Sequence, residues 1–133
     1  MTTRILLTVV WIVLCAGSAA YAEWLRVGTN VDETNVVYVD PNTIRHKGGT
    51  VKWWELWDFK TAQTIGGSTH LSSKIQMEYD CVEERKRILA LVDFSGNMGD
   101  GHVVGDISTE NKWVPVVPES LSQVMWNAAC NKK

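Results

Sequence analysis

The side chains best suited to metal binding are few in this 133-residue chain, and their spacing keeps them apart. The three histidines are His46, His70 and His102, and none has a carboxylate or a second histidine at the spacing of metal ligands. His46 and His102 lie beside expected turns, and His70 opens an expected strand. We therefore expect three surface histidines and no metal site.

The motifs of common enzymes are not found either. Residues 95–101 are rich in glycine, but the serine stands in the wrong place for the nucleophile turn of hydrolases. The same glycines precede an expected strand, whereas a phosphate-binding loop needs a helix N-terminus. Glu83 and Glu84 are followed by three basic residues, which is typical of a solvated turn. The sequence thus predicts no enzymatic activity and no cofactor. A hydrolase or other ligand-transforming enzyme is kept as the third hypothesis for function.

Tryptophan is the unusual residue of this chain, and six of the seven follow residue 22. Trp53, Trp54 and Trp57 lie in one expected strand, where alternate side chains point to opposite faces of a sheet. If Trp53 and Trp57 face the core, Trp54 and Leu56 lie on the opposite face. An exposed aromatic patch marks an interaction site, so Trp54 and Leu56 are the candidate residues for binding a partner. In the alternative, a loop or the stems of the flanking lysines cover Trp54.

Cys81 and Cys130 are the two cysteines that follow the N-terminal apolar segment. In an exported chain they allow a single intramolecular disulfide. That bridge would close a loop with 48 residues between the cysteines, and it would contribute roughly 4 kcal/mol in the chain-entropy account. Two free thiols or an intermolecular bridge are the alternatives.

The first 22 residues have the pattern of a secretory signal peptide. Arg4 supplies the positive charge, residues 5–15 are apolar, and residues 20–22 form an A-x-A cleavage site. Cys15 follows the bulky Leu14, so the small residue that lipoprotein processing requires is missing. An uncleaved membrane anchor is the alternative, because residues 5–22 carry no charge. We expect cleavage after Ala22, with membrane contact only before it.

Residues 23–133 form the expected mature domain, which is long enough for one modest core. This domain lacks Arg4 and contains 12 basic and 15 acidic residues, which gives a net charge of −3. No block of basic residues occurs, so the composition argues against nucleic acid or an anionic membrane surface as a partner.

Apolar and polar residues alternate with a period of two through most of this domain, which is typical of β-strands. The expected strands are 24–29, 36–39 with a short extension over 43–46, 51–60, 70–81, 87–94, 102–107 and 112–117. Turns are expected at 40–42 and 47–49, and a polar loop at 61–69. The alternation is clearest over 70–81, where the side chains of one face are Leu71, Ser73, Ile75, Met77, Tyr79 and Cys81.

A helix is expected near the C-terminus. Ser120 can cap it, and Gln123 stands three residues later as in a capping box. Cys130 lies one turn beyond Trp126 on the same side of this helix, so the helix can reach the sheet at Cys81. The apolar stripe of the helix is Leu121, Val124, Met125 and Ala128.

Together these elements predict an α+β fold. About six antiparallel strands form one sheet, and a single C-terminal helix packs on one face and is tied to it by the disulfide. Covering one face leaves the other in contact with water.

Several short motifs occur in a fixed order through residues 23–133. They are Val37-Tyr38-Val39-Asp40, Thr43-Ile44-Arg45, the aromatic segment 49–60, Ser73-Lys74, Tyr79-Asp80-Cys81, Trp113, Val116-Val117-Pro118, Ser120 and Cys130. In this order the motifs resemble the surface-adhesin protein E family of exported bacterial proteins. The resemblance implies a bent antiparallel sheet whose C-terminal helix is held by the disulfide. It also implies attachment to a host through matrix or serum proteins.

Three hypotheses for function follow. The first is a non-catalytic exported binding module, located in the periplasm, on the cell surface or outside the cell. It would bind a host matrix or envelope protein through its open sheet face or its loops. The second is a structural or accessory protein of the cell envelope without adhesive activity. An exposed Trp54 favours the first, and a covered Trp54 favours the second. The enzyme is the third.

Overall fold

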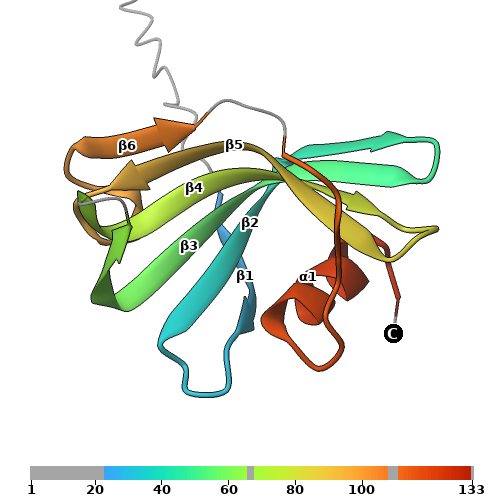
Figure 1. The fold of residues 1–133 in the computed structure, drawn as a ribbon, viewed down its shortest axis with the longest axis horizontal. Helices are drawn as coiled ribbons and strands as arrows, with labels where there is room; N and C mark the ends of the chain where they lie inside the picture. Colours follow the sequence, from blue (N-terminus) through green and yellow to red (C-terminus); the bar gives the residue numbers. More distant parts are fainter. Residues whose placement is uncertain (1–22, 66–67, 108–110, 133) are drawn as a thin grey trace, which may run out of the picture.

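The computed structural model describes residues 23–65, 68–107 and 111–132, and the predicted signal peptide, 1–22, lies outside these residues. Its elements are β1 (Leu25–Thr29), β2 (Asn35–Lys47), β3 (Thr50–Ile65), β4 (Ser68–Asp80), β5 (Arg85–Phe94), the short 3-10 helix η1 (Asn97–Gly99), β6 (Val103–Ile107), β7 (Val114–Pro115) and α1 (Leu121–Ala129). Strands β1 to β6 lie side by side in chain order, and every neighbouring pair is antiparallel (Figure 1). The predicted α+β class is confirmed.

The sheet is strongly bent, and α1 lies beneath one half of it (Figure 1). Each neighbouring pair among β1 to β6 contains one irregularity of register. Such bulges bend a strand and increase its twist. The two-residue β7 and the longer β6 both pair with β5, at its beginning and at its end. The predicted strand over 112–117 is therefore reduced to a short pairing, which ends at a proline that cannot donate to the ladder.

Two connections differ from the prediction. The turn at 40–42 does not end the second strand but forms a bulge within β2, between Asp40 and Arg45. Turn chemistry is present there, because Asp40 Oδ1 accepts a hydrogen bond from the backbone N–H of Asn42 at 3.0 Å. The expected loop over 61–69 instead extends the β3–β4 hairpin, in which Thr64 pairs with Thr69. Threonine is β-branched and favours strands, and this preference prevails over the polarity of the segment.

The capped helix is confirmed, but its predicted apolar stripe was partly wrong. The hydroxyl of Ser120 accepts a hydrogen bond from the backbone N–H of Gln123 at 3.3 Å. Met125, Trp126 and Ala129 are the buried residues, whereas the stripe members Val124 and Ala128 are exposed. Gly28 of β1 explains the close approach of the helix, since a Cβ there would meet Leu121 and Val124 at 3.1 Å.

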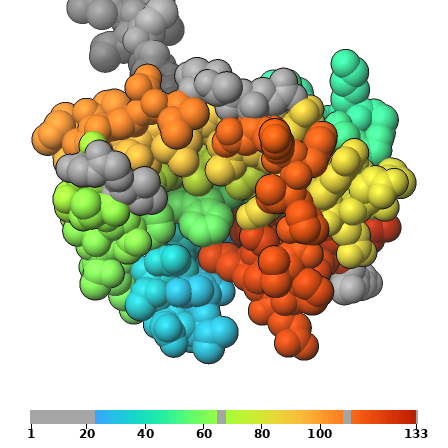
Figure 2. All heavy atoms as spheres, in the orientation of Figure 1, coloured from blue at the N-terminus to red at the C-terminus, as the bar shows by residue number. Residues whose placement is uncertain are grey.

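The core lies between α1 and the half of the sheet above it. Its buried residues are Val37, Val39, Val51, Trp53, Ile75, Met77, Tyr79, Val116, Met125, Trp126 and Ala129. Seen from the helix side, the atoms of α1 and of the segment before it cover one part of the sheet, and the face is hollowed between them and the remaining strands (Figure 2). The face of the sheet opposite to α1 is called the open face below.

Candidate binding surface

The side chain of Trp54 lies half-buried on the open face, whereas its neighbour Trp53 is 4% exposed in the core. Alternation along β3 separates the two rings, as the sequence predicted. Around Trp54 the open face holds an apolar cavity of about 320 Å³, which we call the aromatic pocket. It is lined by Trp24, Asp40, Thr43, Trp54, Lys74, Val92 and Phe94. Lys52 and Lys60, the flanking lysines of the alternative in which Trp54 is covered, do not line the pocket.

Four strands, β2 to β5, and the chain before β1 bring these residues together. Register places Trp54 opposite Asp40 of β2 and Gln76 of β4, and Lys74 opposite Val92 of β5. The ammonium Nζ of Lys74 lies 5.8 Å from the centre of the Trp24 ring and 5.1 Å from that of Phe94. A cation over aromatic faces is attracted by the negative potential of the rings.

Leu56, the second candidate residue, does not lie at the surface. It is on the predicted face, but it is fully buried, so the expectation of an exposed Trp54–Leu56 patch was wrong. The cover is the glycine-rich connection at η1, where Gly99 lies close to Leu56 and Lys74. The backbone N–H groups of Met98 and Gly99 bind Asp58 and Ser72 of the open face, at 2.8 and 2.9 Å.

A buried carboxylate on the other face was missed by the sequence analysis. Glu55 is fully buried and accepts hydrogen bonds from Trp53 Nε1 at 2.8 Å, from Trp57 Nε1 at 2.7 Å and from the hydroxyl of Tyr79. A signal was available, because Glu55 shares the core-facing side of β3 with two tryptophans, whose indole N–H groups need acceptors. The cluster fixes the aromatic core rather than forming an accessible acid.

Burial governs the titration of this cluster. It raises the pKa of Glu55, and the hydrogen bonds from Tyr79, Trp53 and Trp57, together with the charge of Lys86, reduce that rise. Burial and the charge of Glu55 raise the pKa of the Tyr79 phenol well above its ordinary value of 10.0. Burial lowers the pKa of Lys86, against the attraction of Glu55.

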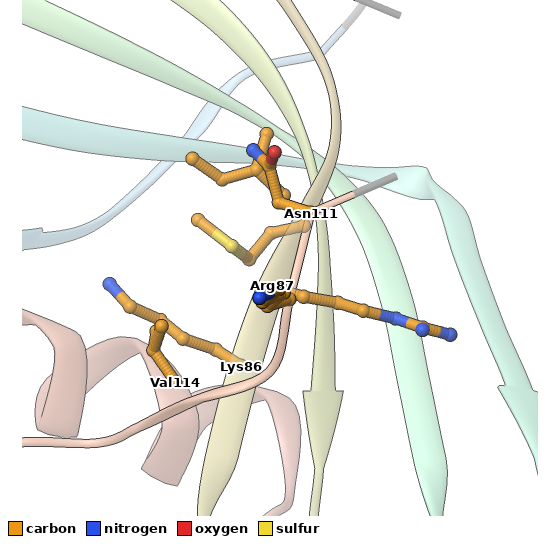
Figure 3. Close-up of a pocket in the computed structure, with 7 residues that line it drawn as sticks. Lys86, Arg87, Asn111 and Val114 are labelled. Carbon is orange, nitrogen blue, oxygen red and sulfur yellow. The ribbon is translucent and has the colours of Figure 1, made fainter. Parts of the chain in front are cut away.

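A second cavity, of about 490 Å³, lies along β5 on the helix side of the sheet (Figure 3). Its lining residues are Met77, Lys86, Arg87, Ile88, Asn111, Lys112 and Val114. Lys86 and Arg87 extend in opposite directions from β5 (Figure 3). Lys86 is hydrogen-bonded to Ser122 of α1 and faces the charge of Glu55, while Arg87 binds Glu78. The charges of Lys86 and Arg87 are thus already engaged within the fold, and the third basic lining residue, Lys112, is exposed.

His70 was predicted at the surface, and this was wrong. It is 2% exposed, because its ring packs edge-on against Phe59 with centres 5.7 Å apart. Its Nε2 lies 3.6 Å from Asp93 Oδ1, which also accepts a hydrogen bond from Ser73 at 2.6 Å. Within the described residues, no group of three or more His, Cys, Asp or Glu side chains could hold a metal ion.

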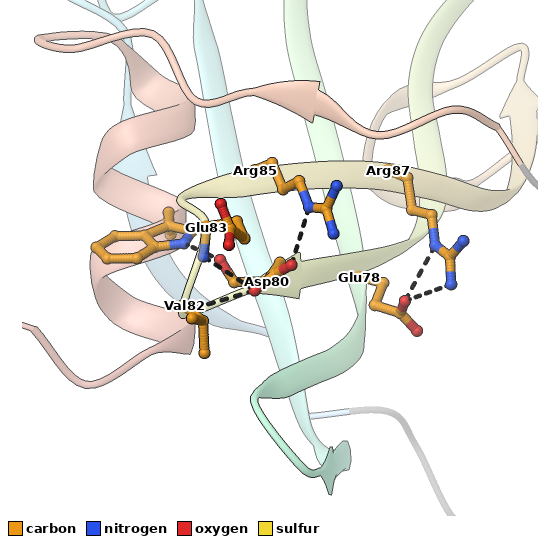
Figure 4. Close-up of polar contacts among 7 residues, drawn as sticks. Glu78, Asp80, Val82, Glu83, Arg85 and Arg87 are labelled. Carbon is orange, nitrogen blue, oxygen red and sulfur yellow. Dashed lines mark hydrogen bonds and ion pairs between the residues drawn. The ribbon is translucent and has the colours of Figure 1, made fainter.

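A ladder of charged pairs joins β4 to β5 at the turn between them (Figure 4). Arg85 Nε binds Asp80 Oδ2 at 2.9 Å, and Arg87 binds Glu78 Oε1 through Nε and Nη2 at 3.0 and 2.7 Å. The ring of Trp113 stacks on both guanidinium groups. Burial raises the pKa of Asp80, but the hydrogen bonds from Arg85 and from two backbone N–H groups prevail and hold it below its ordinary value.

The disulfide between Cys81 and Cys130 is present, with Cα atoms 5.5 Å apart. That separation lies within the roughly 4.4–6.8 Å range of disulfides. It joins the residue after β4 to the residue after α1, as predicted. None of the described helices is long and apolar enough to cross a membrane.

Comparison with known proteins agrees with this geometry. The family described as surface-adhesin protein E matches the chain over residues 24–131. The fold is similar to that of Haemophilus influenzae protein E in its crystal form II, with a TM-score of 0.62 at 10% sequence identity over 85% of this chain and 91% of that one. The Se-Met form of the same protein gives a TM-score of 0.60 at 11% identity, over 85% and 89% of the two chains. No protein with a curated description matches the chain.

Proposed function

Because the chain belongs to the surface-adhesin protein E family, we propose that it is a non-catalytic exported binding module that holds a protein partner on its open face. The observation that carries this proposal is the aromatic pocket. Trp24, Trp54 and Phe94 line one cavity that remains open on the sheet face opposite to α1. Aromatic side chains are enriched at the centres of protein interfaces.

The polar groups of the described residues support binding rather than catalysis. Glu55 is the most deeply buried carboxylate of the described residues, but all three of its donors belong to the core. His70 is enclosed between Phe59 and Asp93. A general acid or base must reach the proton it transfers, and neither of these groups faces the aromatic pocket.

We also propose that the chain is exported and that cleavage after Ala22 releases it to the periplasm, the cell surface or the medium. The disulfide supports this, since such bonds persist in oxidising compartments. The partner would be a matrix or serum protein of a host, or another protein of the envelope. No nucleic acid and no cofactor enter this proposal.

The alternative is a structural or accessory protein of the envelope. One observation favours it: η1 covers Leu56 and leaves a smaller apolar surface than the sequence predicted. The two functions differ in what Trp54 does, because a structural protein has no need of an accessible pocket there.

The test is binding by the protein purified from the envelope fraction. We would immobilise it and measure surface plasmon resonance against purified matrix and serum proteins and against detergent-extracted envelope proteins. We expect saturable binding of one partner that Trp54→Ala abolishes. Val31→Ala is the matched control, because Val31 is 97% exposed and lies outside the pocket. Binding that Trp54→Ala leaves unchanged, or no binding at all, would favour the structural alternative.

A further inference from the structure

The described residues include four basic side chains that are half-buried, and all four lie on β4 or β5: Lys74, Arg85, Lys86 and Arg87. Three of them have partners within the fold. Arg85 binds Asp80, Arg87 binds Glu78, and Lys86 binds Ser122 and is attracted by Glu55.

Lys74 differs from these three, because its ammonium group faces the rings of Trp24 and Phe94. No carboxylate of the described residues forms an ion pair with it within 4.0 Å. A partly desolvated charge is stabilised by aromatic faces, but a carboxylate is a stronger partner. Asp40, the carboxylate among the lining residues, also makes no ion pair with Lys74, so the ammonium group remains available to an incoming anion.

Two other polar groups of the pocket, Asp40 Oδ1 and the hydroxyl of Thr43, are already hydrogen-bonded. Asp40 Oδ1 accepts from the N–H of Asn42, and the hydroxyl of Thr43 donates to the carbonyl of Asp40 at 2.7 Å and accepts from the N–H of Trp54 at 2.9 Å. A sugar ring, which carries several hydroxyl groups, would find few free partners here. A ligand with one anionic group and an apolar body fits the available chemistry better.

The size of the pocket also favours a ligand with a small apolar body. Its volume of about 320 Å³ is at the low end of the roughly 300–1,000 Å³ of small-ligand sites. A cavity of this size accepts one large side chain of a partner rather than an extended surface. The walls around that side chain would be Trp24, Trp54 and Phe94.

We propose that the aromatic pocket binds an apolar side chain of a partner protein together with a carboxylate next to it, which pairs with the ammonium of Lys74. The carboxylate belongs to an adjacent acidic residue or to a C-terminus. This inference rests on the proposed function, since it names the chemistry that the open face recognises. It assigns Lys74 the counter-charge, and Trp24, Trp54 and Phe94 the contact with the apolar group.

The test uses ¹⁵N-labelled protein from the envelope fraction and follows the indole N–H resonances of Trp24 and Trp54, each assigned from its Trp→Phe variant. The probe is N-acetyl-phenylalanine, which has a ring and a free carboxylate. Its amide, with the same ring and no charge, is the matched ligand. We expect saturable shifts of both resonances with the acid and an affinity about tenfold lower for the amide, as for the loss of one charge-assisted hydrogen bond. Added salt should weaken the binding of the acid and leave that of the amide unchanged.

Lys74→Met keeps the length and the apolar stem of the side chain, and should reduce the affinity for the acid to that for the amide. Lys60→Met is the control, since Lys60 is exposed and outside the pocket. Equal affinities of the acid and the amide for the unmodified protein overturn the proposal without any variant. It is also overturned if glucuronate shifts the same resonances and N-acetyl-phenylalanine does not.

This experiment can fail separately from the proposed function. Partner binding that depends on Trp54 but shows no preference for the acid probe refutes the anionic site and leaves the binding module intact. Selective binding of the acid probe without any protein partner supports the site chemistry and refutes the binding module.

Discussion

The indole Nε1 of Trp126 donates a hydrogen bond of 2.9 Å to the backbone carbonyl of Asp80. The donor lies in α1, and the acceptor is the last residue of β4, directly before Cys81. The disulfide lies beside this hydrogen bond. It joins Cys81, one residue after Asp80, to Cys130, four residues after Trp126. Two neighbouring contacts, one covalent and one polar, thus fix the end of the helix to the sheet.

The polar contact can be tested by Trp126→Phe. This change keeps an aromatic ring in the core but leaves the carbonyl of Asp80 without its donor. We expect a loss of about 1–3 kcal/mol in the free energy of unfolding, measured in urea, as for an unsatisfied buried group. Trp126→Ala should cost more, about 3–5 kcal/mol, because it also leaves a cavity. A negligible loss for Trp126→Phe would mean that the ring alone stabilises the helix, and equal losses for the two variants would mean that the ring adds nothing beyond the hydrogen bond.

The disulfide can be tested by Cys81→Ser/Cys130→Ser, which removes both thiols. We expect a loss of roughly 4 kcal/mol in the chain-entropy account. Hydrogen exchange should become fast first in α1, Leu121–Ala129, since a helix of this length is marginal without tertiary support. The amides of β4 should stay protected in the same sample. Simultaneous exchange of helix and sheet would show that the bridge stabilises the whole domain instead.

The two adjacent tryptophans of β3 should respond oppositely. Trp53→Ala removes a ring that is 4% exposed and a donor to Glu55, so we expect a loss of about 3–5 kcal/mol in stability. Trp54→Ala removes a half-buried ring from the open face and should shift the thermal midpoint little. Thermal unfolding followed by circular dichroism measures both. A Trp54→Ala variant as unstable as Trp53→Ala would make Trp54 a core residue and remove the basis of the binding proposal.

Glu55 should give the stability a pH dependence of known sign. Its pKa in the folded protein is raised above the ordinary value of 4.5, so the folded state binds the proton more tightly than the unfolded state. The stabilisation from this group is complete below 4.5 and is lost as the pH rises through the folded pKa. One proton gives a slope of at most about 1.4 kcal/mol per pH unit.

Glu55→Gln removes this titration. The free energy of unfolding of the unmodified protein, minus that of the variant, should therefore decrease with rising pH above 4.5. Asp80 cannot produce this effect, because its lowered pKa gives the opposite sign at pH values below about its ordinary 3.8. A difference that is constant from pH 4.5 to 8 would refute the assignment.

Export can be tested directly. N-terminal sequencing of the protein from the envelope fraction should begin at Glu23, as the A-x-A site predicts. This start would also place Trp24 of the aromatic pocket one residue from the mature N-terminus. A sequence that starts at Met1, or a lipid attached to Cys15, would contradict the prediction.

Much of the fold was determined by local patterns in the sequence. Alternation along 70–81 placed Ile75, Met77 and Tyr79 on the core side, and all three are buried. The capping hydroxyl of Ser120 marked the start of α1. The order of the motifs identified the family. These features depend on neighbouring residues along the chain, and for this reason they could be read without coordinates.

The candidate site was decided by contacts between distant residues. Alternation correctly separated Trp54 from Trp53, but it could not show that η1 folds back over Leu56, nor that Trp24 and Phe94 join Trp54 around Lys74. His70 was likewise buried by Phe59, eleven residues earlier in the chain. A period of two gives the face to which a side chain points, whereas what covers that face depends on the path of the connections. The sequence by itself therefore determined which residues lie on the open face, and only the tertiary structure decided which of them remain accessible.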